Sequence, residues 1–208
     1  MAVYGKSRLK GGCSQDWLPH KVRYLSIEEN IMKSYWICAG VLFAAASLGF
    51  AETKTGQTAS IAIGGKNIVI KYSAPAVDGR EGKLFGKDGR IGQDPNYPVW
   101  RAGANDATAL HTDADLDIGG LAVPKGDYTL FVNLANLANW ELIVNKQTGQ
   151  SGLEYDAKQD LGRVKMTMSK PPAMVEQMKI TLSNTGGNKA RLQLVWEDHA
   201  AAVSMAVK

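Results

Sequence analysis

Cysteine is almost absent from this sequence of 208 residues, which contains only Cys13 and Cys38. Both lie within the first 51 residues, so a chain that begins at residue 52 has no thiol. Such a chain has no disulfide framework, no thiolate nucleophile and no cysteine ligand for a metal ion. The sequence also lacks Gly-x-Ser-x-Gly, His-Glu-x-x-His and a phosphate-cradling loop that ends in Lys-Ser or Lys-Thr. Their absence excludes several common hydrolase and nucleotide-binding signatures.

An excess of charge of one sign is missing from most of the chain. The formal net charge is +4, but six of the 24 Lys and Arg residues and only three of the 20 Asp and Glu residues fall within residues 1–51. The remainder carries 18 basic and 17 acidic side chains and is nearly neutral. A nucleic-acid partner would require a basic stripe or patch, so we do not expect one.

Long apolar runs are confined to residues 32–51. Lys33 supplies a short positive region, Tyr35–Leu48 is apolar, and Gly49-Phe50-Ala51 has small residues at the two positions that a signal peptidase reads. The pattern predicts a signal peptide cleaved after Ala51, and therefore an exported protein, periplasmic or extracellular. The alternative is an uncleaved membrane anchor. Against it, the run is shorter than the ~20 residues of a spanning helix, and the polar stretch from Glu52 follows at once.

Residues 1–31 have no sustained periodicity, and Met32 has the position of a natural start. We therefore interpret residues 1–31 as a non-native or disordered extension. A short linker, residues 52–57, is expected before the folded domain, residues 58–208. With the signal peptide cleaved, we expect no membrane span in that domain.

From residue 58 onward polar and apolar side chains alternate, which is the pattern of half-buried strands. The segments expected as strands are 58–63, 67–73, 107–111, 113–118, 128–133, 140–145, 163–169, 177–183, 189–197 and 202–207. Turn residues recur at intervals of roughly 8–12 residues, and no segment has a convincing helical period. The sequence therefore predicts an all-β fold, a single antiparallel β-sandwich of about nine or ten strands.

Two segments stand out as irregular. Residues 74–98 are rich in glycine and proline, and a connection of this length in a compact domain is usually functional or mobile. Residues 146–160 are polar and are expected to form a loop, with one helical turn near residues 155–158.

The run Val99–Thr108 is the densest mixture of aromatic, cationic, amide and acidic side chains in the sequence. Along a strand, Trp100 and Arg101 face opposite sides. Arg101 either meets a ligand in a pocket or acts as a structural staple, paired with a carboxylate such as Asp106 or Asp127. We favour the staple, because a guanidinium has many donors with which to anchor irregular backbone.

Asn105 and Asp106 occupy a predicted tight bend, where such side chains commonly bond to nearby backbone. In the functional alternative they offer donors and acceptors to a polar ligand, beside Arg80 and Arg101. The candidate ligand-binding residues are Arg80, Trp100, Arg101, Asn105, Asp106 and His111.

The two histidines after residue 51 are His111 and His199. A metal site needs several convergent ligands, and the acidic residues at 113, 115 and 117 lack the order of an EF-hand loop. We expect these acids to form a solvated strand face, and we predict neither a metal site nor a cofactor. Glu197-Asp198-His199 suggests acid–base chemistry, but a polar strand end is the more common origin of such a run.

Several short motifs occur together in one order along the chain. They are Tyr72-Ser73-Ala74-Pro75, Gly79-Arg80, Leu84-Phe85-Gly86, Val99–Thr108, Pro124–Phe131, Trp140–Lys146, Arg163-Val164-Lys165 and Leu194–Asp198. In this order they resemble the secreted bacterial family called domain of unknown function 2911. The resemblance covers about residues 56–208, and Trp-Arg-x-Gly-Ala-Asn-acid-Ala-Thr is its most specific part.

The resemblance implies a β-rich fold and export, and it brings no established activity, cofactor or catalytic residue. Two features depart from the family: Ala74 stands where the family often has Arg, and Lys87–Pro98 is longer and more polar than expected.

These observations favour a secreted or periplasmic β-sandwich that binds a small molecule, a glycan or an envelope protein without catalysis. One alternative is a hydrolase of the cell envelope that uses Asp106, Glu197 or His111. Another is a purely structural envelope protein.

Overall fold

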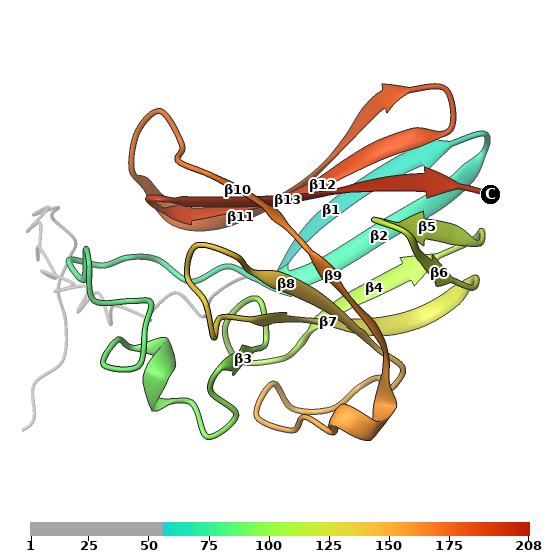
Figure 1. Cartoon of the computed structure of the whole chain (residues 1–208). Helices are drawn as coiled ribbons and strands as arrows, with labels where there is room; N and C mark the ends of the chain where they lie inside the picture. Colours follow the sequence, from blue (N-terminus) through green and yellow to red (C-terminus); the bar gives the residue numbers. More distant parts are fainter. Residues whose placement is uncertain (1–55) are drawn as a thin grey trace, which may run out of the picture. The chain divides into compact units, whose positions relative to one another are not determined.

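The structure is a computed structural model that describes residues 56–208, which form two antiparallel β-sheets packed over one core (Figure 1). These residues contain thirteen strands, two short 3-10 helices and no α-helix. The all-β sandwich predicted from sequence is confirmed. The interpretations of residues 1–31 and 32–51, and of the linker up to residue 55, fall outside the described residues; Gly56 and Gln57, assigned to that linker, already belong to the first strand.

The first sheet has seven strands, in the order β1-β2-β4-β7-β8-β9, with β3 paired to β7. Their bounds are β1 Gly56–Ile63, β2 Lys66–Ser73, β3 Val99–Trp100, β4 Thr108–Thr112, β7 Gly126–Asn133, β8 Glu141–Asn145 and β9 Asp160–Lys165. β1 and β2 form the predicted hairpin. Gly64 and Gly65 both have positive φ there, as a two-residue turn between twisted strands requires.

The second sheet has six strands, in the order β11-β12-β13-β5-β6, with β10 paired to β13. Their bounds are β5 Leu116–Ile118, β6 Leu121–Val123, β10 Thr167–Ser169, β11 Val175–Gly186, β12 Lys189–Glu197 and β13 His199–Val207. The hairpin between β11 and β12 turns at Gly187 and Asn188, within the predicted connection, and Gly186 and Gly187 both have positive φ.

Each of the ten predicted strand segments overlaps a strand of the structure, and the three additional strands have simple origins. β3 and β6 are two and three residues long, too short for alternation to be visible in the sequence. The predicted strand 163–169 is divided between β9 and β10, which belong to different sheets.

Alternation along the strands builds the core. On β4, Thr108, Leu110 and Thr112 are buried while Ala109 and His111 are exposed. Both sheets contribute to one buried cluster, and a fully buried side chain such as Leu110 or Ile118 contributes about 1.5–3 kcal/mol to folding.

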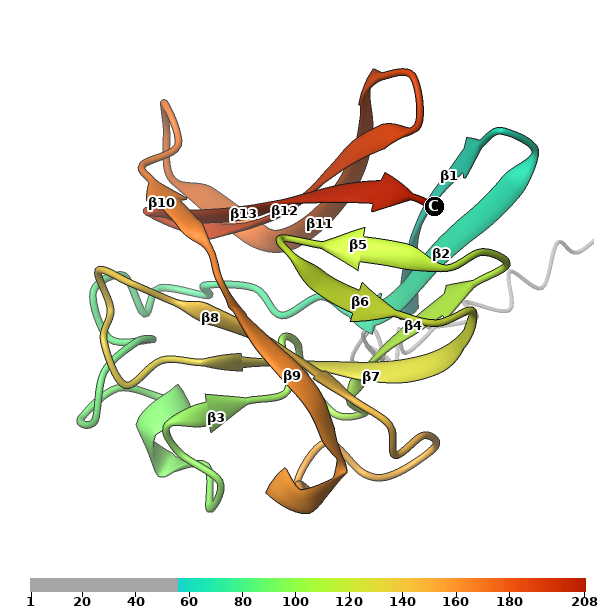
Figure 2. The ribbon, with the colours of Figure 1, turned by 45° about the vertical axis from the view of Figure 1, so that its right-hand side comes forward.

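The chain passes directly from one sheet to the other between β9 and β10 (Figure 2). Met166 alone separates the two strands. It is buried, and its amide donates to the carbonyl of Trp140 at 2.9 Å.

The two irregular segments are located as predicted. Residues 74–98 contain one isolated bridge, between Ala76 and Gln177, and the 3-10 helix η1 (Ile91–Gln93). The loop after β8 contains the 3-10 helix η2 (Ala157–Gln159), close to the predicted helical turn. Across residues 56–208, no helix has the length and apolar character needed to cross a membrane.

Candidate functional site

The long segment after β2 lies at the end of the sandwich away from the C-terminus (Figure 1). This segment lines a pocket. The pocket has a volume of ≈ 430 Å³, and small-molecule sites are typically about 300–1,000 Å³. It lies between this segment, the run that follows β3, and Trp196 on β12. Four of the six candidate residues line it: Arg80, Trp100, Arg101 and Asn105.

Arg101 is a structural staple on the wall of this pocket. Its Nη2 lies 2.5 Å from Oδ2 of Asp94, and its Nη1 donates to the carbonyl of Asn105 at 3.1 Å. The side chains of Arg101 and Asp94 are only 18% and 5% exposed. The predicted staple has this geometry, but the predicted partners Asp106 and Asp127 were wrong, because the loop folds Asp94 over the guanidinium instead.

The loop between β8 and β9 packs against the same arginine. Gly152 is buried there, and a Cβ atom at this position would collide with Cδ of Arg101 and with the carbonyl oxygen of Asn105. One residue on, the carbonyl of Leu153 accepts from Nδ2 of Asn96 at 2.7 Å. Leu153 is 47% exposed and forms an apolar rim of the pocket.

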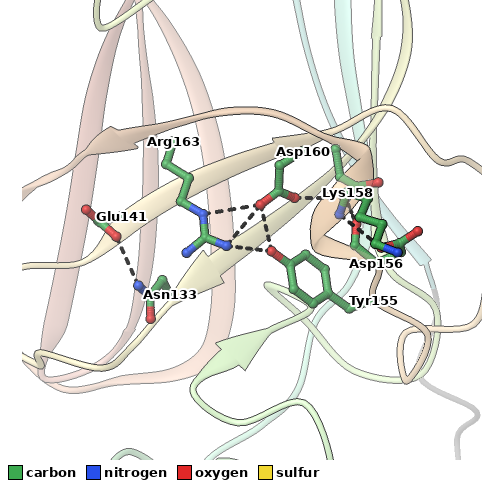
Figure 3. A network of polar contacts seen from close by, with 8 residues as sticks. Asn133, Glu141, Tyr155, Asp156, Lys158, Asp160 and Arg163 are labelled. Atoms are coloured by element: carbon green, nitrogen blue, oxygen red, sulfur yellow. Dashed lines mark hydrogen bonds and ion pairs between the residues drawn. The ribbon is translucent and has the colours of Figure 1, made fainter.

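A polar network holds this loop on the first sheet (Figure 3). The hydroxyl of Tyr155 donates to Oδ2 of Asp160 at 2.7 Å and accepts from Nη2 of Arg163 at 2.7 Å. Arg163 also donates to Asp160 at 3.0 Å. Burial, together with the Asp160 carboxylate, raises the pKa of Tyr155 to about 12. The ring of Tyr155 packs edge-on against Phe131, so the loop is fixed by both polar and apolar contacts.

The non-glycine residues with left-handed backbone lie around the pocket. Within residues 56–208, the non-glycine residues with positive φ are Asp78, Ala102, Asn105 and Glu197. Each lies in, or adjoins, a segment that lines the pocket. For Ala102, with φ 53°, this conformation costs roughly 1–2 kcal/mol, because the Cβ approaches the following carbonyl. Backbone strain of this kind collects at ligand-binding and catalytic sites.

The base of the pocket is formed by aromatic rings that are buried from solvent. The rings of Trp100 and Trp196 stack with centroids 5.8 Å apart, and Phe85 packs edge-on against both. The indole N–H of Trp100 donates to the carbonyl of Gly103 at 3.0 Å. Trp100 and Trp196 are only 2% and 3% exposed, so their faces are not available for a ligand to stack on.

Arg80 is held by the backbone in a fixed orientation. Its Nε donates to the carbonyl of Val77 at 2.8 Å, and its Nη2 donates to that of Ala76 at 3.0 Å. Its ion pair with Asp78 is long, 3.7 Å, and the Asp78 side chain is 82% exposed, so this pair contributes little. Nη1 of Arg80 has no hydrogen-bond acceptor among residues 56–208.

Three further polar side chains on the pocket wall have no partner within the part of the chain that the structure describes. They are Arg90, Gln93 and Asn105, and all three are exposed. Their donors and acceptors are therefore available to a molecule in the pocket.

Two candidate residues lie elsewhere. Asp106 forms an isolated bridge with Ser151 and borders a separate pocket with Lys71 and Gln150. His111 lies on the exposed face of β4. The structure therefore does not bring these two side chains together with the four that line the first pocket.

His111 is held between two carboxylates on the sheet surface. Its Nδ1 lies 2.7 Å from Oδ1 of Asp127, its cross-strand neighbour on β7, and its Nε2 lies 3.1 Å from Oδ1 of Asp113. Hydrogen bonding to Asp127 and then to Asp113 raises the pKa of His111 above its ordinary value. Both ring nitrogens therefore have hydrogen-bond partners within the protein.

Glu197, Asp198 and His199 lie at the turn between β12 and β13, with ligand atoms within 4.8 Å of one another. Each group already contacts other atoms of the protein. A buried oxygen of Glu197 accepts from the amide of Gly82, and Asp198 lies 2.5 Å from Nδ1 of His199 and 3.8 Å from Nζ of Lys170. The contact between Glu197 and Gly82 fastens the turn to the long segment after β2, and the contact between Asp198 and Lys170 connects it to the loop after β10.

Sequence reasoning did not identify Asp94, Arg90, Gln93 and Trp196 as pocket residues. The glycine and proline content of residues 74–98 indicated a functional loop, but without periodicity the sequence could not show which side chains turn inward. Trp196 was assigned to a strand, and nothing in its sequence pattern indicates that the strand ends at a pocket.

The fold and this site define a β-sandwich protein with an arginine-lined pocket at one end. The chain belongs to the family described as "Protein of unknown function (DUF2911)", whose model matches residues 54–205, in agreement with the resemblance seen in the sequence. No curated protein and no solved structure matches the chain.

Proposed function

We propose that this protein is an exported, single-domain binding module that takes a small polar molecule into the pocket beside Trp100 and Arg101, without catalysis. The observation that carries the proposal is that one pocket is lined both by a fixed ion pair and by polar side chains that have no hydrogen-bond partner in the described chain. Arg101 and Asp94 are locked together, whereas Arg90, Gln93 and Asn105 face the same pocket without partners in the described chain. A preformed concave site with a few convergent polar groups is typical of ligand binding.

The hydrolase alternative depends on Asp106, Glu197 or His111. Asp106 and His111 border different pockets, and Glu197 is buried with one oxygen occupied by a backbone amide. General acid–base catalysis needs groups within hydrogen-bond reach of one substrate, so this arrangement favours binding over hydrolysis.

The test is ligand titration followed by amide NMR, using a panel of neutral and acidic monosaccharides, amino acids and dicarboxylates. We expect at least one probe to shift the amide signals of Arg90, Gln93 and Asn105. Ala104→Leu fills the pocket and should abolish the shifts, whereas Ala135→Leu, on an exposed loop away from the pocket, should not.

Two outcomes contradict the proposal. Turnover of a panel compound that Asp106→Ala abolishes would make the protein an enzyme. A panel that leaves every pocket signal unmoved would favour the purely structural envelope role.

Export remains part of the proposal and has its own test. Cleavage of the predicted signal peptide after Ala51 gives a mature chain that begins at Glu52. Intact-mass spectrometry of protein isolated from the producing cells measures this directly. A mature species that retains Cys38 would contradict cleavage, and a peptide from residues 1–31 would contradict a start at Met32.

A further inference from the structure

We infer that the ligand of this pocket is an acidic sugar, whose anionic group meets Arg80 and Arg90 and whose hydroxyl groups meet Gln93 and Asn105. The inference rests on the proposed function and deepens it by naming the class of ligand. The shared chemistry is an anion on a polyhydroxylated body, and the anion is either a carboxylate or a phosphate.

The first argument is charge. The pocket is lined by three arginines and one aspartate, although the chain after residue 51 is nearly neutral. The aspartate, Asp94, is used by Arg101, so the pair presents little net charge. Arg80 and Arg90 remain as cations on the wall, and their charge attracts an anion.

The second argument is geometry. Two backbone carbonyls hold the guanidinium of Arg80, which leaves its Nη1 edge as a fixed donor group. A guanidinium fixed in this way loses little conformational freedom when it binds a carboxylate or a phosphate. Arg90 is exposed and has no partner within residues 56–208, so it can approach the same anion from a second side.

The third argument concerns the body of the ligand. The indole faces of Trp100 and Trp196 are closed to solvent, so an aromatic ligand finds no surface to stack on. The amides of Gln93 and Asn105 are free and each carries both donors and an acceptor, which suits hydroxyl groups. The volume of ≈ 430 Å³ accommodates a monosaccharide or a disaccharide.

Isothermal titration calorimetry with three matched probes tests the inference: glucuronate, glucose 6-phosphate and neutral glucose. We expect one of the two acidic sugars to bind at least about tenfold more tightly than glucose, because only an acidic sugar offers a charged acceptor to the two guanidinium groups. The tighter of the two identifies the anion as carboxylate or phosphate.

Arg90→Ala should weaken binding of that sugar by about tenfold or more, because it removes a charged donor without disturbing any intramolecular contact. Lys87→Ala is the matched control. It removes the same charge from the same segment but does not line the pocket, and it should leave the affinity unchanged.

Glucose that binds as tightly as both acids would overturn the inference while leaving the proposed function intact. Equal losses in Arg90→Ala and Lys87→Ala would also overturn it, because the effect would then be general electrostatics. If Ala104→Leu fails to block any binding that is seen, the proposed function itself fails.

Discussion

The guanidinium of Arg101 and the carboxylate of Asp94 lie 2.5 Å apart, and both side chains are largely buried. The other oxygen of Asp94 accepts from the amide of Asn96 at 3.0 Å, so the carboxylate bridges a cation and the backbone. This pair joins the long segment after β2 to the run after β3, and it fixes the wall of the pocket.

Removal of Arg101 should therefore destabilise the whole fold. Arg101→Ala leaves Asp94 buried without its cation, and we expect the free energy of unfolding to fall by about 3–5 kcal/mol. Arg101→Lys should recover only part of the loss, because an ammonium cannot reproduce the two-sided guanidinium contact. Urea unfolding measures both. Arg90→Ala, at an exposed position, should stay within ~0.5 kcal/mol of the parent; an Arg101→Ala curve that overlays the parent curve would refute the staple.

Gly152 should not tolerate a side chain. A Cβ atom there would overlap Cδ of Arg101 and the carbonyl oxygen of Asn105, so Gly152→Ala must displace the staple or the loop. We expect a loss of about 1–3 kcal/mol in unfolding experiments, typical of overpacking. Gly56→Ala is the control, because nothing lies within 4 Å of a Cβ at that position. Equal stabilities of the two variants would show that the loop adjusts freely.

The His111 ring should titrate above the ordinary histidine value. Because the folded pKa is raised, the interaction stabilises the fold at pH values below about 6.5, the unfolded pKa, and this stabilisation is lost as the pH rises through the folded pKa. NMR titration of the ring protons follows the change. Asp127→Asn should lower the pKa more than Asp113→Asn, since the Asp127 contact is the larger cause. Asp117→Asn, which leaves both contacts in place, should not shift it, and an unshifted titration in the Asp127 variant would contradict the assignment.

Tyr155 should ionise later than an ordinary tyrosine. Its folded pKa of about 12 lies above the unfolded value of about 10. The contribution of the protonated hydroxyl to the stability of the fold is therefore fully present below about pH 10, and it is lost as the pH rises through the folded pKa. The absorbance of tyrosinate measures the ionisation, and Tyr155→Phe should remove the last phase of the titration. The same variant keeps the packing on Phe131 and the direct contact between Arg163 and Asp160, but it loses the hydrogen bonds of the hydroxyl to both residues, at a cost of about 1 kcal/mol. If all tyrosines of the parent protein ionised near pH 10, burial of the Tyr155 hydroxyl would be contradicted.

Some strands were predictable from sequence because one of their faces is buried and the other exposed, so that apolar and polar residues alternate along them. Others, such as β7 and β8, are buried on both faces and were found from their content of β-branched, aromatic and aliphatic residues. The β4 pattern, in which Leu110 is buried and His111 exposed, is visible in the order of the residues alone. Pairing within hairpins also followed, because a glycine turn sets the register of its two strands.

The site was only partly predictable, because its walls come from backbone without a repeating pattern. The sequence pointed to Arg101 as a staple, but the choice of Asp94 over Asp106 depends on the path of residues 74–98, which no periodicity defines. Asp106 and Asn105 are adjacent in sequence, yet they border different pockets. Asn105 has left-handed backbone, with φ 60°, so the alternation of an extended strand does not describe where these two side chains lie.

The passage from β9 to β10 through Met166 has a consequence for how the protein unfolds. The continuous segment β9–Met166–β10 is hydrogen-bonded to β8 in one sheet and to β13 in the other. The two sheets therefore cannot move apart unless β9 leaves β8 or β10 leaves β13. We therefore expect the sandwich to unfold as a single cooperative unit, and a destabilising change at the pocket, which both sheets line, to lower the free energy of opening of both.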